Sequence, residues 1–272
     1  MDFHFHKPSG FLSHFVESIV FFEHYDGDYK AEKMLPDGYH DLVIDLTETP
    51  KHIFDNETLQ VTQTCTNSWL SGARQKLLTR DAGGNDSSMM VIRFHYGSAF
   101  HFARMPACEL TDSVVDTDLL FGNKVNELRE KVIECGDPDL KFSIVEKFLT
   151  NHLLRLEIPD IITHSVHLIK ENPSTHTIKQ ITEKMGYSQK HFIHLFKKHV
   201  GLTPKAFQRI QRFQKIIYEL ESDQMINWTS LSLDCGYFDQ AHFINDFRAF
   251  SGMNPKQYLL EKGPLMNYIS VK

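Results

Sequence analysis

The stretch GYFDQAHFINDFRAFSGMNPKQY (residues 236–258) repeats an earlier stretch of the same chain, GYSQKHFIHLFKKHVGLTPKAF (residues 186–207). From the shared histidine onward the two copies are offset by 51 residues (242 − 191). At the leading Gly-Tyr pair the offset is 50 (236 − 186), so the second copy has one more residue in its turn. This density of matches indicates that one structural unit occurs twice.

Each copy predicts a helix, a tight turn and a second helix. In the first copy, Gly186 can supply the left-handed residue that ends a helix, and Ser188 is a favourable N-cap for the next helix. Gly201 then closes that second helix, and Pro204 stands where it can open the following one. This order of elements is typical of a helix-turn-helix module. The second copy has candidates for the same positions: Asn227 or Thr229 and Asp239 as N-caps, and Gly236 as the break.

A longer helix is predicted between the two modules. One helical stripe of apolar residues lets this linker helix hold the modules in a fixed relation. Two recognition helices on one frame can enter major-groove faces one helical turn apart, roughly 34 Å along the duplex. A single chain can therefore bind a site of two turns without a palindrome. The stripe consists of Phe207, Ile210, Phe213, Ile217 and Leu220.

The outward face of each module is where contacts with DNA are expected. Glutamine can pair with adenine edges, lysine can bind guanine or phosphate, and a capping serine can bind phosphate at a helix N-terminus. The predicted DNA-binding residues are Ser188, Gln189, Lys190, His194 and Lys197 in the first module, Lys205, Arg209 and Arg212 in the linker helix, and Asp239, Gln240, Ala241, Asn245 and Arg248 in the second module. The alternatives are a solvated polar face and, for Arg209, a structural ion pair with Glu183. The predicted inward residues are Phe192, Phe196, Phe243 and Phe247, and His191 and His242 are expected to be half-buried packing residues.

Charge is distributed unevenly along the chain. The 272 residues have a formal net charge of −6, which taken alone argues against a nucleic-acid binder. Residues 1–159 contain 15 Lys/Arg and 25 Asp/Glu (−10), whereas residues 160–272 contain 14 and 10 (+4). Within the second part, residues 177–218 hold nine Lys/Arg against one acid, a net charge of +8. Such a concentration is expected of a surface that faces phosphates, although a solvated basic face is the alternative.

The second module carries a different charge from the first. Residues 227–262 have three Lys/Arg against four acids, a net charge of −1. We therefore expect the first module to supply most of the electrostatic affinity for DNA. The second module is expected to contribute shape, register or a contact with RNA polymerase.

The amino-terminal part of the chain reads as strands followed by helices. Short β-rich runs occur at residues 20–22, 41–46 and 89–94, and they predict a small antiparallel β-barrel or sandwich. Turn signals bound these runs at Asp26-Gly27, Pro36-Asp37-Gly38 and Gly83-Gly84-Asn85. After Pro106 the apolar period changes to 3.6, which predicts trailing helices with apolar faces at Val125, Leu128, Val132 and Ile133 and at Ile144, Val145, Phe148, Leu149 and Leu153.

The helical pattern breaks at residues 157–160, where Asp160 is a candidate N-cap. The predicted domains are therefore residues 1–158, for sensing, regulation or dimerisation, and residues 159–272, for DNA binding. The fold class is α+β. It combines the amino-terminal barrel or sandwich and its helices with an all-α domain of two helix-turn-helix modules joined by the linker helix.

Residues 160–262 resemble the two-module DNA-binding domain of the AraC/XylS family of bacterial transcription regulators. The resemblance is carried by residues 234–255 in the second module, and by residues 201–207 with Arg209 and Arg212 at the exit of the first. It implies binding to double-stranded promoter DNA, usually to activate transcription together with RNA polymerase. The first 158 residues resemble a recurrent amino-terminal partner of such regulators, through residues 35–38 with Asp41-Leu42, Ser71-Gly72, residues 91–94 and residues 110–112. This implies a small β-barrel sensing domain of unknown ligand.

Several classes of protein are not indicated. No apolar run approaches the ~18–20 residues of a membrane span, and no secretory signal opens the sequence, so a cytoplasmic protein with no membrane partner is predicted. Cys65, Cys108, Cys135 and Cys235 form no metal or redox motif. His4 and His6 would point to one side of a strand, but they have no acidic or thiol partner at a metal-ligand spacing, so no metal or cofactor is predicted.

The residues Asp37, His40 and Asp41 leave two interpretations open. They could carry acid–base chemistry, but Pro36-Asp37-Gly38 is also a turn before a strand, and the turn is favoured. The leading hypothesis is a transcription regulator and not an enzyme. Its barrel would sense a small molecule or mediate homodimer formation. The alternatives are a barrel-domain enzyme, metal-dependent or DNA-modifying, tethered to DNA by the carboxy-terminal domain, and a ligand-free barrel that only dimerises.

Overall fold

The structure is a computed structural model that describes residues 2–25, 30–82, 87–154, 158–174, 176–221, 227–263 and 265–271. The turns predicted at Asp26-Gly27 and Gly83-Gly84-Asn85 lie outside these residues, and so does Glu157, the first residue of the break predicted at residues 157–160. No described helix is both long and apolar enough to cross a bilayer.

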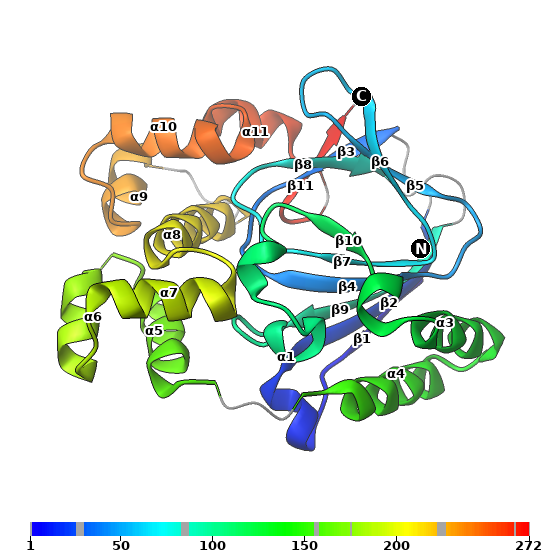
Figure 1. Ribbon diagram of the computed structural model, residues 1–272. Coiled ribbons are helices and arrows are strands. Elements are labelled where there is room, and N and C mark those ends of the chain that lie inside the picture. The colour runs from blue at the N-terminus through cyan, green and yellow to red at the C-terminus, as the bar shows by residue number, and fades with distance from the viewer. Residues whose placement is uncertain are drawn as a thin grey trace.

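The amino-terminal half contains two antiparallel β-sheets that face each other (Figure 1). Among the described residues the sheets do not join, so the predicted barrel or sandwich is a sandwich. The first sheet has the order β1 (Asp2–His6), β2 (Val16–Tyr25), β9 (Ser87–Phe94), β4 (His40–Asp45), β7 (Ser68–Ser71) and β10 (Val114–Asp116). The second has the order β11 (Tyr268–Val271), β3 (Ala31–Met34), β8 (Leu78–Asp81), β5 (Lys51–Phe54) and β6 (Val61–Cys65).

Strand β4 shows why this half folds as layers. All six of its residues are buried, and alternate side chains point to opposite faces of the sheet. Leu42 and Ile44 pack with the helices outside the sheet, whereas Val43 packs with Trp69 in the space between the sheets. The first sheet therefore has an apolar partner on both faces.

The trailing helices cover the outer face of the first sheet (Figure 1). They bury most of the predicted apolar positions, but Ile133 is 42% exposed, so its assignment to the inward face was wrong. Ile144 and Leu153 are only partly buried. The helices of the amino-terminal half are η1 (Gly10–His14), which precedes β2, and α1 (Phe100–Ala103), η2 (Ala107–Glu109), α2 (Asp118–Phe121), α3 (Lys124–Glu134) and α4 (Pro138–His152), which follow β9.

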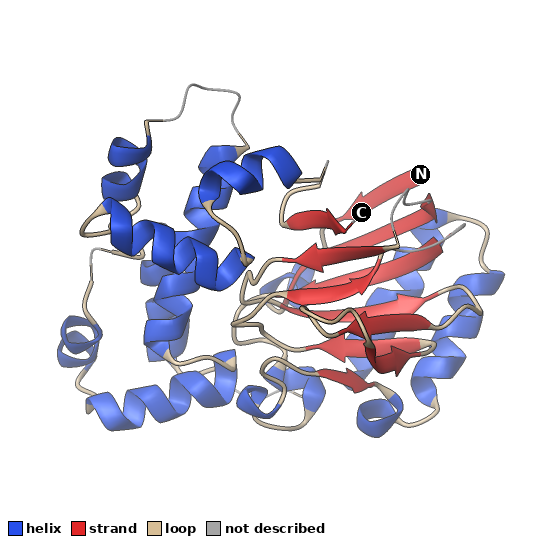
Figure 2. Ribbon diagram, turned by 90° about the horizontal axis from the view of Figure 1, so that it is seen from above, coloured by secondary structure: helices blue, strands red, loops and turns tan. Residues whose placement is uncertain are grey.

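The carboxy-terminal half consists mainly of helices that gather on one side of the molecule, with the strands on the other (Figure 2). Asp160 is the first residue of its helix, and Pro159 occupies the N-cap position without a side-chain cap, so the predicted N-cap was wrong. The helices are α5 (Asp160–Glu171), α6 (Ile178–Met185), α7 (Gln189–Val200), α8 (Pro204–Leu220), α9 (Trp228–Asp234), α10 (Gln240–Ser251) and α11 (Pro255–Glu261).

The end of the chain returns to the amino-terminal half. Strand β11 pairs antiparallel with β3, with Tyr268 opposite Met34 and Val271 opposite Ala31. The sequence pattern did not predict this strand. The domain boundary between residues 158 and 159 stays a prediction, and β11 adds one element from beyond it to the sandwich.

Candidate nucleic-acid interface

The first helix-turn-helix module has the local geometry that its sequence predicts. Gly186 ends α6 in the left-handed region at φ +72°. Ser188 caps α7, because its Oγ accepts a hydrogen bond from the backbone N–H of His191 at 3.3 Å. Phe192 and Phe196 are fully buried, and they set which face of α7 points outward.

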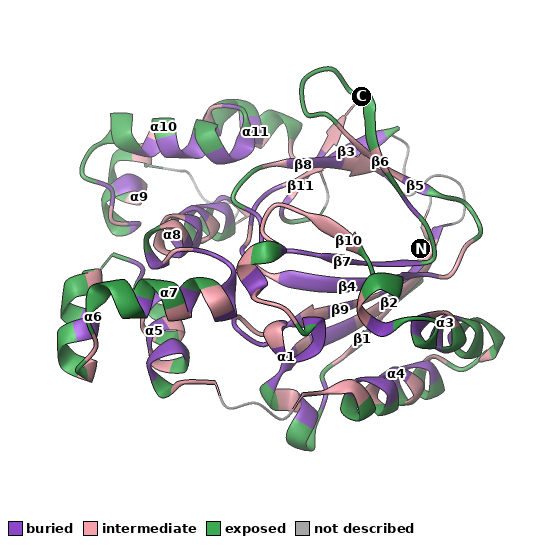
Figure 3. Cartoon of the chain, viewed as in Figure 1, coloured by how far each residue is buried: buried purple, intermediate pink, exposed green. Residues whose placement is uncertain are grey.

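The predicted contact residues of this module all lie on that outward face. Ser188, Gln189, Lys190, His194 and Lys197 are exposed, and Figure 3 shows the outer side of α6 and α7 as exposed. Each has the position that a base or phosphate contact requires, and whether each makes one stays a prediction.

The second module repeats this arrangement. Asn227 caps α9 by accepting from the N–H groups of Thr229 and Ser230 at 3.1 Å, which settles the two alternatives for this position. Asp239 caps α10, and its Oδ1 accepts from the N–H of His242 at 2.7 Å. The carboxylate of Asp239 therefore serves the helix itself. The other predicted contact residues on α10 are exposed: Gln240, Ala241, Asn245 and Arg248.

The turn of the second module depends on a glycine without a side chain. Gly236 has φ +77°, and a Cβ atom there would lie 1.7 Å from Oγ of Ser174. That hydroxyl donates to the carbonyl of Cys235 at 3.1 Å, so it is held in place. Glycine is required here by both conformation and space.

Arg209 and Asp246 join the linker helix to the second recognition helix. Nη2 of Arg209 lies 2.7 Å from Oδ1 of Asp246, and Nε lies 3.4 Å from Oδ2. The guanidinium also sits 5.1 Å from the ring centre of Phe250. The structural ion pair suggested for Arg209 is present, but its partner is Asp246 and not Glu183, which lies 3.7 Å from Lys179 of its own helix. In this conformation Arg209 supports α10 instead of presenting a free cation.

The other two cations predicted on the linker helix differ from each other. Lys205 is exposed. Arg212 lies over the ring of Tyr237 at 5.2 Å, and its Nη1 donates to the carbonyl of Gly236 at 3.5 Å. Arg212 thus supports the turn before α10, and Lys205 is the better placed of the two for a phosphate.

Two histidines differ from their prediction. His191 and His242 are exposed, not half-buried. Each ring contacts the tyrosine of the preceding turn, with 5.6 Å between the ring centres of His191 and Tyr187, and 5.2 Å between those of His242 and Tyr237. Because the two histidine rings are exposed, a bound duplex could contact them.

An exposed aromatic residue, which was not among the predicted contact residues, lies beside α10. Phe238 is 88% exposed and directly precedes the cap of α10. Phe238 is the one extra residue in the turn of the second copy. The offset between the two copies is 50 before this turn and 51 after it, and this difference was the signal for the residue. An exposed phenylalanine at this edge can contact a thymine methyl group.

The linker helix also contacts the amino-terminal half. Nε2 of Gln214 donates to the carbonyl of Pro36 at 2.9 Å, and Nε2 of Gln211 lies 3.2 Å from Oη of Tyr96. Tyr96 packs edge-to-face on Phe207, with 4.8 Å between ring centres. The turn at residues 35–38 is therefore part of the contact between the two halves.

The favoured interpretation of Asp37 as a turn residue agrees with the structure. Its Oδ1 accepts from the N–H of Tyr39 at 3.0 Å, and its Oδ2 lies 3.0 Å from Arg93. Burial raises the pKa of Asp37, although the charge of Arg93 acts in the opposite direction. Burial lowers the pKa of His40 to about 4, so this imidazole is neutral at pH 7.

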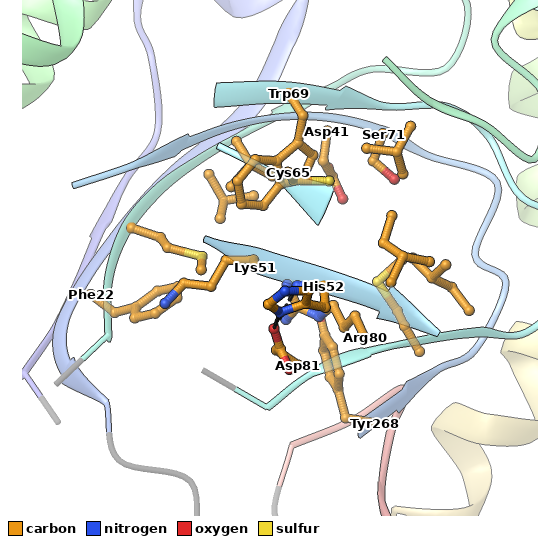
Figure 4. Close-up of a pocket in the computed structure, with 17 residues that line it drawn as sticks. Phe22, Asp41, Lys51, His52, Cys65, Trp69, Ser71, Arg80, Asp81 and Tyr268 are labelled. Carbon is orange, nitrogen blue, oxygen red and sulfur yellow. Dashed lines mark hydrogen bonds and ion pairs between the residues drawn. The ribbon is translucent and has the colours of Figure 1, made fainter. Parts of the chain in front are cut away.

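A cavity lies between the two sheets (Figure 4). It has an inner part of about 100 Å³ and a wider part of about 320 Å³. Its walls carry two ion pairs. Arg93 binds both carboxylate oxygens of Asp41 at 2.8 and 2.7 Å, and Arg80 lies 2.7 Å from Glu32. The residues that line both parts are Phe22, Met34, Asp41, Arg80, Val91 and Tyr268.

The residues considered for metal binding or catalysis have structural partners. His4 stacks on Phe21 at 5.6 Å, and His6 stacks on Phe142 at 4.9 Å between ring centres. Burial raises the pKa values of Cys65 and Cys235 to about 11, so these thiols are protonated at neutral pH. Protonated thiols are poor nucleophiles.

One further group of side chains has ligand-like spacing. The ligand atoms of Asp2, Glu23 and His24 all lie within 4.8 Å of one another at the surface. Exposed acidic groups commonly cluster without binding an ion, so this group alone does not define a metal site.

Comparison with protein families gives two matches to separate parts of the chain. Residues 167–261 match a helix-turn-helix domain, and residues 4–116 match a domain of unknown function, DUF6597. An uncharacterised HTH-type transcriptional regulator of Haemophilus influenzae is 26% identical over 106 residues, which is 39% of this chain. The bifunctional transcriptional activator and DNA repair enzyme Ada of Escherichia coli is 27% identical over 99 residues, which is 36% of this chain. The aligned segments span only 35% and 27% of these two relatives.

Among solved structures, ToxT from Vibrio cholerae aligns with 89% of this chain and 98% of its own, at 10% identity and a TM-score of 0.49. A probable AraC family transcriptional regulator from Rhodopseudomonas palustris aligns with 39% of this chain and 99% of its own, at 25% identity and a TM-score of 0.34. These likenesses are too distant to carry an argument about function. The family match and the geometry together show that residues 167–261 form a helix-turn-helix domain, with two capped modules on one linker helix.

Proposed function

We propose that the protein is a sequence-specific DNA-binding regulator of transcription. The observation that carries this proposal is the repeated module. Helices α7 and α10 are both capped at their N-termini, buried on the phenylalanine side and exposed on the polar side. Helix α8 joins them through its own apolar core and through Arg209. Such a frame can present two recognition helices to successive turns of one duplex.

The two modules are proposed to contribute differently to binding. The first module and the linker helix concentrate the positive charge of the chain, so they supply most of the phosphate attraction. In the second module Asp239 and Asp246 are used within the protein, as a cap and as the partner of Arg209. Its contribution is therefore expected through base contacts of Gln240, Ala241 and Asn245, through shape, or through RNA polymerase.

The amino-terminal half is proposed to sense a small molecule in the cavity between the sheets. The cavity has an apolar wall of Phe22, Met34 and Val91, together with the guanidinium groups of Arg80 and Arg93. Nε of Arg80 is buried without a hydrogen-bond partner among the described residues. These features suit an apolar organic molecule that carries an oxygen acceptor.

The remaining parts of the proposal concern partners and place of action. Residues 1–158 and 159–272 are proposed as the two domains. The family matches, which end at residue 116 and begin at residue 167, are compatible with this division. Action in the cytoplasm, a homodimer and a contact with RNA polymerase belong to the same proposal. We propose no enzymatic activity, and the protonated buried thiols support this choice.

Selection of bound duplexes from a random pool tests the proposed function. The full chain is incubated with the pool at low salt, and the bound duplexes are amplified, sequenced and titrated with salt. We expect one enriched motif of about two helical turns and a steep loss of affinity as salt rises. Equal retention of all sequences, or binding that is insensitive to salt, would overturn the proposal.

A further inference from the structure

The last residues of the chain connect the cavity with the helix-turn-helix domain. Helix α11 ends at Glu261, and the chain then reverses through a tight turn in which Asn267 has φ +71°. The backbones of Lys262 and Ile269 form an isolated antiparallel β-bridge, and the N–H of Gly263 donates to the carbonyl of Tyr268 at 3.1 Å. The other edge of β11 pairs with β3 of the sandwich. We call residues 265–271 the C-terminal strap.

Tyr268 and its neighbour Ile269 in the strap belong to different parts of the molecule. Tyr268 lines both parts of the cavity, where Arg80 lies 5.4 Å from the centre of its ring. Ile269 is 1% exposed and belongs to the apolar core of the helical half. Neighbouring residues of a strand point to opposite faces, so a displacement of Tyr268 must also displace Ile269.

Two contacts tie this part of the chain to the end and the middle of the linker helix. Before the strap, Nζ of Lys262 lies 2.9 Å from Glu221 and donates to the carbonyl of Leu220 at 3.3 Å. At its turn, Oδ1 of Asn267 accepts from Nε2 of Gln214 at 2.9 Å. The backbone carbonyl of Asn267 accepts from the N–H of Leu35 in the sandwich at 2.9 Å. The strap is therefore bonded to both halves at the same place.

The strap also forms part of the cavity wall. Leu265, Met266, Asn267 and Tyr268 line its wider part, opposite residues of β2 and β9. A molecule in the cavity would touch a segment that continues directly into α11 of the second module. Figure 1 shows β11 beside β3, with α10 and α11 on the same side of the molecule.

We propose that the C-terminal strap transmits the state of the cavity to the second helix-turn-helix module. An occupant that contacts Tyr268 and Met266 stabilises the pairing of β11 with β3 and, through Ile269, the packing of α10 and α11. An empty cavity, or one that is altered beside Tyr268, loosens the same chain of contacts. This inference rests on the proposed sensing role of the cavity, and it assigns the route by which that role reaches DNA.

Hydrogen–deuterium exchange of the full chain tests the route without requiring DNA or a known ligand. The probe is a change inside the cavity, the double variant Glu32→Gln/Arg80→Met, which removes both members of an ion pair together. The matched control is Trp69→Phe, which changes the cavity wall at the far end from Tyr268 in Figure 4. We expect the double variant to speed amide exchange in β11 and α11 by about fivefold, equivalent to roughly 1 kcal/mol of opening free energy. The control should leave both segments unchanged.

The same measurement in two further backgrounds decides whether the strap is the route. In Tyr268→Ala, and in a chain that ends at Lys262, the double variant should no longer alter exchange in α10 or α11. A circular-dichroism melt establishes whether each background is folded. If the shortened chain is unfolded, the exchange of the Tyr268→Ala background decides whether the strap is the route. An equal response of α10 and α11 in Tyr268→Ala, or no response in the full chain, would overturn the inference. Since no DNA is used, either result is independent of the duplex selection.

Discussion

The guanidinium of Arg209 on the linker helix holds the carboxylate of Asp246 on the second recognition helix through two contacts, at 2.7 and 3.4 Å. The side chain of Asp246 is only 9% exposed, whereas that of Arg209 is 39% exposed. This pair defines how α10 is oriented on the frame that it shares with α7. It also explains why an acidic residue can occur in a recognition helix.

Replacement of Arg209 should affect orientation more than electrostatic attraction. We expect Arg209→Ala to weaken binding to the selected duplex while leaving the dependence of affinity on salt unchanged, because its charge is already paired. Lys190→Ala, the matched change at an exposed cation, should lower the salt slope by about 1. Salt titrations of both variants measure the difference. An equal fall in slope for the two would show that Arg209 contacts phosphate.

Asp246 should stabilise the second module only while Arg209 is present. Asp246→Ala leaves a partly buried guanidinium without its partner and should destabilise the protein by about 1–2 kcal/mol. In the double variant with Arg209→Ala, the loss should be smaller than the sum of the single losses. Urea unfolding of the four proteins in the cycle measures the coupling. Strict additivity would contradict the role assigned to the pair.

The first module should dominate the electrostatic part of the affinity. We expect Lys190→Ala/Lys197→Ala to reduce affinity for all duplexes alike and to lower the salt slope by about 2. Gln240→Ala/Asn245→Ala should instead reduce discrimination among duplexes, because these side chains can pair with base edges and carry no charge to neutralise a phosphate. At low salt, the double lysine variant should weaken binding more than the variant Gln240→Ala/Asn245→Ala. An equal or smaller effect would show that the first module does not supply most of the electrostatic affinity.

Two glycines in equivalent turns should respond differently to alanine. Gly186 and Gly236 have similar φ values, +72° and +77°, so both substitutions incur the left-handed strain of about 1–2 kcal/mol. At Gly186 no atom lies within 4 Å of the added Cβ, whereas at Gly236 the Cβ would collide with Ser174. Gly236→Ala should therefore lower the melting temperature more than Gly186→Ala. Equal shifts would show that the contact with Ser174 does not constrain the turn.

Acidification should destabilise the protein through a histidine beside the first module. His40 is 2% exposed, and a Cβ on Gly201 would lie 3.3 Å from its ring. Its folded-state pKa of about 4 is below the ordinary value of 6.5, so the unfolded chain binds the proton more readily. Stability is then lost as pH falls from about 6.5 towards 4, by up to roughly 3 kcal/mol from this group.

The variant His40→Gln provides the matched control for this prediction. It cannot titrate, so its unfolding free energy should change less between pH 6.5 and 4 than that of the unaltered protein. His199 has its pKa lowered to about 4 by burial and then by Lys198, and it will add its own dependence in both proteins. Identical pH profiles for the two proteins would exclude a contribution from His40.

The sequence was sufficient to predict the two modules, because their signals are local. Glycines at φ near +75°, capping side chains and apolar spacing act within a few residues, and they marked α6, α7, α9 and α10. The partner of Arg209 was not predictable in this way. Asp246 lies 37 residues further along the chain, and only the packing of α10 on α8 brings the two charges together.

The strap and the cavity were also beyond local patterns. Strand β11 has four residues, and its stability comes from pairing with β3, more than 230 positions earlier in the chain (268 − 34 = 234). A segment of four residues is too short for its apolar pattern to predict such a partner. The ion pairs of the cavity likewise join residues of neighbouring strands whose register depends on the whole sheet.

A hydroxyl-radical footprint of the protein on its selected duplex tests whether both modules bind DNA. We expect two protected segments on one side of the duplex, about one helical turn apart. Lys190→Ala should weaken protection mainly in one segment and Gln240→Ala mainly in the other. A single protected segment unaffected by changes in α10, or no protection at all, would contradict the claim that both modules read DNA.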